Sequence, residues 1–420
     1  MNMDDLEKAF KEVRSLQVQT PQGFAGNLVK ESRYSFQYPD GSDPSVAVGL
    51  LMPVRAEGYA AGNLFGPFGM NRAEGYLRHR IDEHFKRFGA VTDIFILYLT
   101  GQSQIGRLEY SNADYPLEKL KAESLSDILT SPSAEYFDYL LSKYALRSGI
   151  SGAQPKTLVP ILSSSPANSA SLDRGLDDRG TVATETVIVK AEGADFPDIA
   201  RNEFFCISVA KNAGMAVPGF WLSDDSRLFV MDRFDRTPAG GKIGFEDFTV
   251  LTRRTADEKY VGSYEMIAKA VAVYAGDDKV RQAQRLFDRV ALSCLLRDGD
   301  AHLKNFGMLY DHPDAPRELA PVFDVVNTDL YPDLVGRLAL KMGGSNTFPT
   351  PDDLIAYAEK IGVSSKYASA TLDRINTAIE STLKQFKDDP RYQDDLLDRL
   401  EKTIFRVDWA PQQKKPERQR

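Results

Sequence analysis

The stretch Gly299-Asp300-Ala301-His302-Leu303-Lys304-Asn305-Phe306-Gly307 carries an aspartate and an asparagine separated by four residues. It follows an apolar helical pattern at residues 280–296 and leads into an apolar run at 306–310, which we predict to be a strand. In phosphoryl transfer, a carboxylate accepts the proton of the attacking hydroxyl and a nearby amide oxygen binds the metal. The stretch therefore predicts a catalytic loop with Asp300 as base and Asn305 as metal ligand. The alternative is a polar turn whose side chains bond only to backbone groups.

A second carboxylate follows this loop. Residues 319–323 read as a strand that ends at Asp324, where kinase folds place another ligand of Mg²⁺. Mg²⁺ prefers a few carboxylate or amide oxygens together with phosphate oxygens and water. Asn305, Asp324 and a bound ATP would supply such a set. Without the other features, Asp324 would read as an exposed turn residue.

A lysine and a glutamate upstream match the same chemistry. Residues 186–190 form a β-branched run that ends in Lys190, and residues 198–213 follow as a helix. A strand lysine can neutralise the α- and β-phosphates of a nucleotide. Glu203 lies on a mostly apolar stripe of the helix, where a carboxylate needs a partner. We predict that it pairs with Lys190; the alternative is a partly exposed Glu203 at the edge of the stripe.

A glycine-containing loop comes before these elements. The segment Ser148-Gly149-Ile150-Ser151-Gly152-Ala153-Gln154-Pro155-Lys156 joins a helical pattern at 134–145 to a predicted strand at 157–162, and its backbone N–H groups could approach phosphate. Residues 163–178 are rich in Ser, Asp and Gly and predict a loop. Glycine loop, strand lysine, helix glutamate, linking strand at 228–231, catalytic loop and final aspartate follow the order of kinase-type folds.

The remaining periodicity predicts an α+β, bilobal protein-kinase-like fold. Residues 46–108 read as a small α+β domain with strands at 94–99 and 105–108, and helices dominate after residue 231, at 264–274, 280–296, 351–361 and 368–386. We predict four parts: an N-terminal subdomain (1–115), a β-rich nucleotide-binding lobe (116–235), a helical catalytic lobe (236–410) and a basic, disordered tail (411–420).

The composition indicates a globular protein that stays in the cytoplasm. Hydrophobic residues make up 42% of the chain, no apolar run approaches the span of a bilayer, and the first residues are charged, unlike a secretory signal. The net charge of 52 − 60 = −8 does not favour direct binding to DNA. Cys206 and Cys294 lie in apolar helical patterns and are expected in the core, not in a disulfide. The histidines are not grouped at metal-ligand spacing, so we expect no zinc site.

At these residues the chain resembles the HipA family of serine/threonine kinases. The similar pieces, found between residues 137 and 324, are Ser151-Gly152-Ala153-Gln154-Pro155-Lys156, Asn202-Glu203-Phe204-Phe205-Cys206, Asp232-Arg233-Phe234-Asp235-Arg236 and residues 299–307. The resemblance implies that Asp300, Lys190 and Glu203 are catalytic and that Asn305 and Asp324 hold Mg²⁺. It implies a nucleotide site for ATP made by Gly152, Ala153, Gln154, Lys156, Lys190, Met231, Asp232, Phe234, His302 and Lys304, with residues 231–234 as the hinge that meets adenine. Arg233 and Asp235 could equally form a structural ion pair.

The resemblance also implies a role. Family members act as toxins that phosphorylate a protein of the translation machinery, often an aminoacyl-tRNA synthetase, and many are restrained by a helix-turn-helix antitoxin that binds operator DNA. We expect a protein substrate, an antitoxin partner, DNA contact only through that antitoxin, and no membrane. One alternative is a small-molecule phosphotransferase of the aminoglycoside type, and another is an inactive kinase-fold scaffold that binds an antitoxin.

The chain departs from the family in the glycine loop. Members that inactivate themselves carry a serine where this chain has Gly149, flanked by Ser148 and Ser151. We predict that any self-phosphorylation falls on Ser148 or Ser151, with Ser151 favoured because it belongs to the better-matched motif. A phosphoserine adds about −1.5 to −2 charge, so the modified loop would be repelled from the nucleotide's phosphates.

Overall fold

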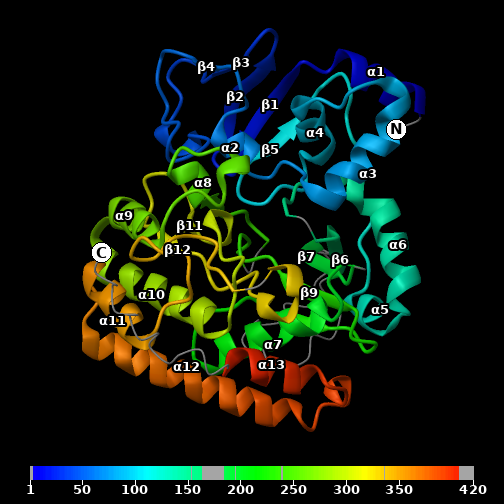
Figure 1. Cartoon of the computed structure of the whole chain (residues 1–420). Coiled ribbons are helices and arrows are strands. Elements are labelled where there is room, and N and C mark those ends of the chain that lie inside the picture. The colour runs from blue at the N-terminus through cyan, green and yellow to red at the C-terminus, as the bar shows by residue number, and fades with distance from the viewer. Residues whose placement is uncertain are drawn as a thin grey trace, which may run out of the picture.

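The structure, a computed structural model, describes residues 3–152, 154–162, 184–193, 195–237, 240–334 and 336–405. Its first part is an antiparallel five-stranded sheet in the order β4-β3-β2-β1-β5, with helices packed beside it (Figure 1). Leu16 and Val18 of β1 are buried and alternate with less buried side chains, as a sheet with one covered face requires. This part consists of α1 (Met3–Glu12), β1 (Ser15–Thr20), β2 (Gly23–Lys30), β3 (Tyr34–Gln37), β4 (Tyr59–Ala61), α2 (Gly66–Gly69), α3 (Gly75–Phe85), α4 (Asp93–Thr100) and β5 (Glu109–Ser111).

The two strands predicted at 94–99 and 105–108 are wrong. Residues 94–99 lie in helix α4, and residues 105–108 belong to neither a helix nor a strand. Every residue from Ile94 to Leu99 is buried, so the run has no polar face that would distinguish the period of a helix from that of a strand. The side chain of Thr92 accepts a hydrogen bond from the Phe95 N–H and caps the helix.

The middle of the chain is an antiparallel four-stranded sheet in the order β6-β7-β9-β8. Lys190 of β7 pairs across the sheet with Lys156 of β6 and with Phe229 of β9, so it lies in the interior of the sheet. The strands predicted at 157–162, 186–190 and 228–231 and the helix predicted at 198–213 are confirmed. The elements are α5 (Leu125–Thr130), α6 (Ser133–Tyr144), β6 (Lys156–Leu162), β7 (Thr184–Ala191), α7 (Ile199–Asn212), β8 (Phe220–Leu222) and β9 (Leu228–Asp232).

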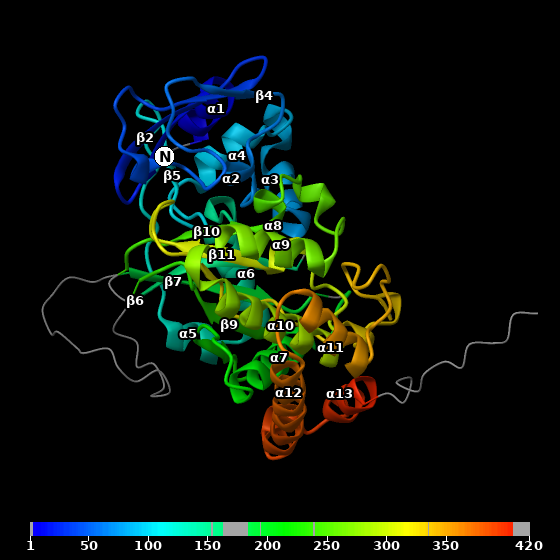
Figure 2. The same ribbon diagram turned by 90° about the vertical axis from the view of Figure 1, so that its left-hand side faces the viewer.

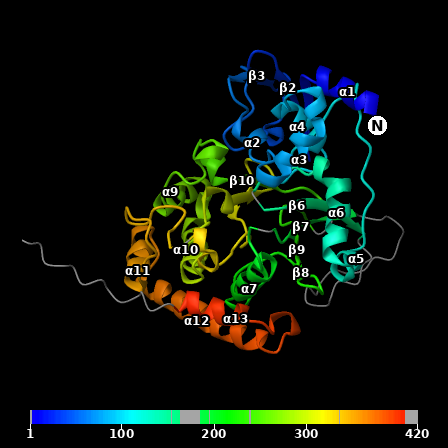
Figure 3. The same cartoon turned by 45° about the vertical axis from the view of Figure 1, so that its right-hand side comes forward.

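The last part is mostly helical and contains a small three-stranded sheet in the order β10-β11-β12. Figure 2 shows the five-stranded sheet at one end of the molecule and α12 at the other, and Figure 3 shows α12 and α13 side by side at that end. The elements are β10 (Gly244–Asp247), α8 (Phe248–Leu251), α9 (Tyr264–Tyr274), α10 (Lys279–Leu295), β11 (Gly307–Tyr310), β12 (Glu318–Leu319), α11 (Pro351–Lys360), α12 (Ser365–Phe386) and α13 (Leu396–Ile404). The predicted helices are confirmed, but the strand predicted at 319–323 is wrong beyond Leu319, because only Glu318 and Leu319 pair with β11.

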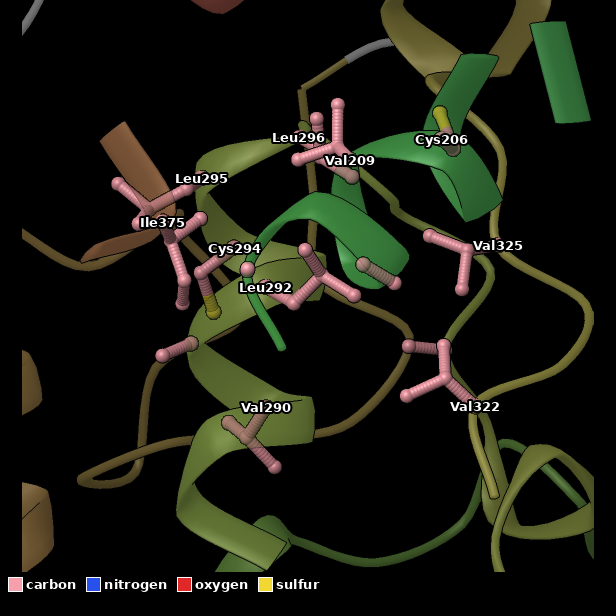
Figure 4. Packing of buried hydrophobic residues seen from close by; sticks show 14 of the residues in the cluster. Cys206, Val209, Val290, Leu292, Cys294, Leu295, Leu296, Val322, Val325 and Ile375 are labelled. Carbon is pink, nitrogen blue, oxygen red and sulfur yellow. The ribbon is translucent and has the colours of Figure 1, made fainter. Parts of the chain in front are cut away.

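Buried apolar side chains fix the backbone around Asp324. Figure 4 shows part of the large cluster that fills the helical lobe, which includes Val322 and Val325, Cys206 of α7 and Cys294 of α10. Val322 and Val325 are 5% and 0% exposed, so the chain is anchored on both sides of Asp324. The two cysteines are free and buried, as the sequence predicts.

The arrangement is the predicted α+β, bilobal one. The boundaries proposed at residues 115, 235 and 410 stay predictions, and the loop at 163–178 and the tail at 411–420 lie outside the described residues. Among the described helices, none combines the length and the apolar character needed to cross a bilayer.

Candidate active site

A cavity of about 370 Å³ lies where the N-terminal part, the four-stranded sheet and the helical lobe come together. Most of the side chains predicted to act in catalysis or in binding line it: Ser151, Gly152, Gln154, Lys156, Lys190, Met231, Phe234, Asp300, His302, Lys304, Asn305 and Asp324. Asp232 and Ser148 do not line the cavity, and Glu203 contacts it only through Lys190. Ala153 lies outside the described residues.

Lys190 is held between two carboxylates. Its Nζ lies 2.6 Å from Oε1 of Glu203 and 2.7 Å from Oδ1 of Asp324. The side chains of Lys190 and Glu203 are 5% and 0% exposed, so an unpaired charge at either position would be strongly destabilising. The structure brings Lys190 and Glu203 together as the sequence predicts, and it adds Asp324 as a second partner.

Two lysines keep Asp324 ionised. Burial would raise the pKa of Asp324, but the ammonium groups of Lys190 and Lys156 outweigh burial and hold that pKa well below its usual range. Burial would lower the pKa of Lys190, but the carboxylates of Asp324 and Glu203 raise it. Asp324 also has a φ of 55°, a left-handed conformation that is uncommon outside glycine and often marks functional sites. An ionised carboxylate is the form that binds a metal.

The loop after α10 holds Asp300 through its backbone. The Gly299 N–H donates to Oγ1 of Thr328 over 2.8 Å, and the Asp300 N–H donates to Oδ1 of Asp298 over 3.0 Å. A Cβ atom at position 299 would lie 2.6 Å from the carbonyl oxygen of Arg337, so this close approach requires glycine. The loop shape is therefore fixed by contacts that do not involve the Asp300 carboxylate.

Asn305 links the two acidic residues and leaves one oxygen without a partner. Its Nδ2 donates to the carbonyl oxygen of Asp300 over 3.3 Å and to that of Asp324 over 3.2 Å. Its Oδ1 is buried and accepts no hydrogen bond from the described residues. A buried acceptor without a partner costs about 1–3 kcal/mol, which a ligand at that atom would offset. The amide oxygen and the Asp324 carboxylate, whose side chain is 36% exposed, together fit a hard cation such as Mg²⁺.

Asp300 has the properties of a general base. Burial raises the pKa of its carboxyl, and a hydrogen bond from Tyr260 offsets only part of that rise. The Tyr260 hydroxyl donates to Oδ1 of Asp300 over 2.7 Å. A base whose pKa lies closer to the working pH takes up a proton more readily, so burial favours this function.

The glycine loop is tied to the four-stranded sheet. Gly152 has a φ of +126°, and a Cβ atom there would lie 2.2 Å from Nζ of Lys156, so only glycine allows the buried lysine to take this place. The side-chain amide of Gln154 donates to the carbonyl oxygen of Ala191 over 3.1 Å. Lys156 is 5% exposed, and burial lowers the pKa of its ammonium group.

The two serines of this loop differ in their surroundings. Ser148 is fully buried: its Oγ donates to the carbonyl oxygen of Tyr144, accepts from the Leu158 N–H and lies 2.9 Å from Oγ1 of Thr157. Ser151 is half-buried and lines the cavity. In this conformation only Ser151 faces the place where phosphate is expected.

The end of β9 and the segment after it contain both a cavity wall and a structural ion pair. Met231 and Phe234 line the cavity. The Arg233 guanidinium lies 2.5 Å from Oδ2 of Asp235, and both side chains are 1% exposed. The structure therefore brings Arg233 and Asp235 together as the ion pair that the sequence left open.

The two other polar residues of the catalytic loop differ: His302 is a neutral imidazole, and Lys304 bonds to the N-terminal part of the chain. Burial lowers the pKa of His302 to about 3, so its imidazole is neutral at pH 7. Nζ of Lys304 donates to Oε1 of Glu74 over 2.9 Å and to the carbonyl oxygen of Met70 over 3.0 Å. Lys304 thus connects the catalytic loop to the N-terminal part of the chain.

Three residues that shape the site were not predicted from the sequence: Asp298, Tyr260 and Glu74. Asp298 is fully buried, and burial raises its pKa to about 7. Tyr260 precedes Asp300 by 40 positions and Glu74 precedes Lys304 by 230, so no local spacing connects them. Only Asp298, two residues before Asp300, was within reach of sequence reasoning.

Two family models match the chain. The model for the HipA N-terminal domain matches residues 16–111, and the model for the HipA-like C-terminal domain matches residues 148–383, which is more than half of the chain. The second match contains the glycine loop, the strand lysine, the catalytic loop and Asp324.

Individual proteins are similar as well. The Sinorhizobium fredii kinase candidate Y4dM is 28% identical over 218 residues, which cover 47% of this chain and 52% of that protein. The kinase candidate Y4mE from the same organism is 29% identical over 227 residues, which cover 51% of this chain and 50% of that protein. The chain spans about half the length of these curated relatives. The solved Shewanella oneidensis toxin–antitoxin complex of HipA, HipB and operator DNA has a chain with a TM-score of 0.66 at 16% identity, covering 93% of this chain and 95% of that one. That likeness confirms the predicted fold.

Proposed function

The chain belongs to the HipA family, and we propose that it is a Mg·ATP-dependent serine/threonine protein kinase. The observation that carries the proposal is the meeting of four elements in one cavity. Lys190 from β7 lies within 2.7 Å of carboxylates from α7 and from the segment after β12, and the catalytic loop brings Asn305 against the Asp324 carbonyl. A lysine, a metal-binding pair and a base within one cavity are the parts that phosphoryl transfer needs.

Each residue has a separate task in this proposal. Asp300 accepts the proton of the acceptor hydroxyl while that oxygen forms its bond to the γ-phosphorus. Lys190 contacts the phosphates, and Glu203 keeps its ammonium group in place. Oδ1 of Asn305 and the Asp324 carboxylate would hold Mg²⁺, which neutralises charge on the phosphate oxygens when it is bound.

The nucleotide would occupy the rest of the cavity. The backbone around Gly152 would approach the phosphates, with Gln154 and Lys156 beside it. The segment from residue 231 to 234 would meet adenine, because Met231 and Phe234 present an apolar wall to the cavity. His302 and Lys304 line the cavity on the side of the catalytic loop.

We further propose that the chain is the toxin of a toxin–antitoxin pair. The similar Shewanella oneidensis chain belongs to a complex with HipB and operator DNA, which supports a helix-turn-helix antitoxin as partner here. DNA contact would then pass through the antitoxin, in keeping with a net charge of −8. The acceptor would be a protein of the translation machinery, such as an aminoacyl-tRNA synthetase, and the protein would act in the cytoplasm.

A labelling experiment tests the proposal. The purified chain is incubated with γ-labelled ATP and Mg²⁺, either with a cell protein extract or with a panel of aminoglycosides and small hydroxyl metabolites. We expect label on serine or threonine of a protein, and none with the Asp300→Asn variant. Label on small molecules alone would make the chain a small-molecule phosphotransferase, and no label in either arm would make it an inactive scaffold.

A further inference from the structure

The phenol of Tyr260 is the hydrogen-bond donor that the structure gives to the Asp300 carboxylate. The two oxygen atoms are 2.7 Å apart. Tyr260 also lines the cavity, and its ring meets the His302 ring edge-on at 5.0 Å between centroids. The base of the proposed kinase therefore already contacts a hydroxyl from its own chain.

This contact has the geometry that an acceptor hydroxyl needs. A general base must lie within about 2.6–3.2 Å of the oxygen whose proton it removes. The Tyr260 hydroxyl meets that condition at Oδ1, so a serine or threonine hydroxyl that uses the same oxygen of Asp300 has to displace it.

We propose that Tyr260 holds the acceptor position at Asp300 and has to be displaced before an acceptor hydroxyl, or water, can be activated there. The inference rests on the proposed kinase function. It makes Tyr260 a specificity-determining residue: an acceptor that brings further contacts to the cavity mouth displaces the phenol, whereas a water molecule, which brings none, does so poorly. The phenol thereby suppresses the hydrolysis of ATP.

The side chain can leave without movement of the backbone. Tyr260 is 49% exposed, so its ring has solvent on one side. The backbone on both sides is fixed: the Leu303 N–H donates to the carbonyl oxygen of Lys259 over 3.1 Å, and the Lys341 N–H donates to that of Gly262 over 3.2 Å. Rotation about the side-chain bonds is therefore enough to free Asp300.

The surroundings indicate what kind of acceptor displaces the phenol. Val261 and Leu334 are 50% and 43% exposed, and Leu334 lines the same cavity as Tyr260. A polypeptide that presents apolar residues next to its serine or threonine could cover these side chains, whereas a small alcohol could not. The need to displace the phenol thus favours proteins as acceptors over small alcohols.

Hydrolysis of ATP in the absence of any acceptor tests the inference without knowledge of the substrate. In this reaction the water oxygen bonds to the γ-phosphorus, the bond from that phosphorus to the bridging oxygen breaks to release ADP, and the water proton passes to Asp300. We expect Tyr260→Phe to raise phosphate release from Mg·ATP about ten- to hundredfold, because a hydrogen bond to a charged group no longer has to be broken.

The matched control is Tyr367→Phe. Tyr367 also donates its hydroxyl to an aspartate, Asp288, over 3.0 Å, but it lies on α12 and does not line the cavity. This variant removes the same kind of bond and should leave the hydrolysis rate unchanged. Thermal unfolding of both variants checks that the fold is intact.

The outcomes separate the inference from the function it rests on. If Tyr260→Phe lowers the rate, the phenol positions Asp300 and the inference is overturned; an unchanged rate overturns it as well. In both cases turnover by the wild type leaves the kinase function standing. No turnover of ATP by the wild type, with or without a protein extract, would overturn the proposed function and the inference together.

Discussion

Two charge clusters each contribute residues to the lining of the same cavity, and they differ in how their polar atoms are satisfied. The first joins Arg233, Asp235 and Arg236 after β9, and we call it the closed cluster. The second joins Lys190, Glu203, Asp324 and Asn305, and we call it the open cluster. Both contain buried cations paired with aspartate, so burial and charge alone do not distinguish them.

The closed cluster is satisfied by the protein itself. Asp235 accepts hydrogen bonds from Arg233, from Arg236 over 2.8 Å and from the Gly106 N–H over 2.6 Å. Both guanidinium groups also donate to the carbonyl oxygen of Gln104. Gln104 and Gly106 come from the N-terminal part, so this cluster joins that part to the segment after β9.

The open cluster contains buried acceptor atoms that no donor of the described residues satisfies. Oε2 of Glu203 and Oδ1 of Asn305 are buried and have no partner among the described residues, and the Asp324 side chain is 36% exposed to the cavity. A folded protein rarely leaves a buried acceptor unsatisfied without a functional reason. From this difference we predict that breaking the closed cluster costs stability, and we propose the open cluster as the site that binds metal and nucleotide.

Asp300→Asn should give the largest effect. The backbone bonds of this loop remain and only the base is lost, so phosphoryl transfer should fall by about 10²- to 10⁴-fold while the fold and nucleotide binding persist. Rates of transfer from labelled ATP, with circular dichroism as the control for folding, check this. Transfer activity within a few fold of the wild type would show that Asp300 is not the catalytic base.

Asp235→Asn should act on stability instead. It leaves the buried Arg233 and the half-buried Arg236 without their counter-charge, which should lower the free energy of unfolding by about 3–5 kcal/mol. Urea unfolding measures this change. Asp373→Asn is the matched control, because Asp373 is exposed on α12. An equal, small change in both variants would mean that the closed cluster does not stabilise the fold.

Substitutions of Lys190 and Glu203 should have coupled effects on the rate of ATP turnover. Once Lys190→Met has removed the cation, Glu203→Gln should cost much less turnover than it does alone, with a coupling energy of about 1–3 kcal/mol. A double-mutant cycle on the rate of ATP turnover measures it. Additive losses would show that the two side chains, 2.6 Å apart in the structure, act independently.

The two serines of the glycine loop show the same contrast between a polar group bonded within the protein and one that faces the cavity. Ser148 is buried with its hydroxyl fully bonded, whereas Ser151 faces the cavity. We expect that mass spectrometry after incubation with Mg·ATP finds a minor fraction of phosphate on Ser151, and that this phosphate depends on Asp300. Phosphate found only outside residues 148–156, or equal phosphate in the Asp300→Asn variant, would contradict the expectation.

The sequence predicted the parts of the site that depend on local pattern. Asp300 and Asn305 share one loop, and Lys190 ends a β-branched run, so spacing and periodicity were enough to identify them. Glu203 stood out because it interrupts an apolar stripe. The residues 94–99 were misread as a strand, because a fully buried run shows no period.

Contacts between distant segments could not be predicted. Nothing near Lys304 in the sequence indicates that it bonds to Glu74, and nothing near Tyr260 indicates Asp300. Which acceptors of the site lack a partner could not be predicted from the sequence either. Oδ1 of Asn305 is left without a partner by the packing of several elements around it.

Calorimetric titration with ATP, in the presence of Mg²⁺ or of a chelator, tests most directly that the open cluster is the metal and nucleotide site. The wild type and Asp235→Asn, each kept at a temperature where it is folded, should bind ATP more tightly with Mg²⁺ than without it. Asp324→Asn should lose this advantage, with an affinity for Mg·ATP at least about tenfold weaker. An Asp324→Asn variant that binds Mg·ATP as tightly as the wild type would contradict the assignment.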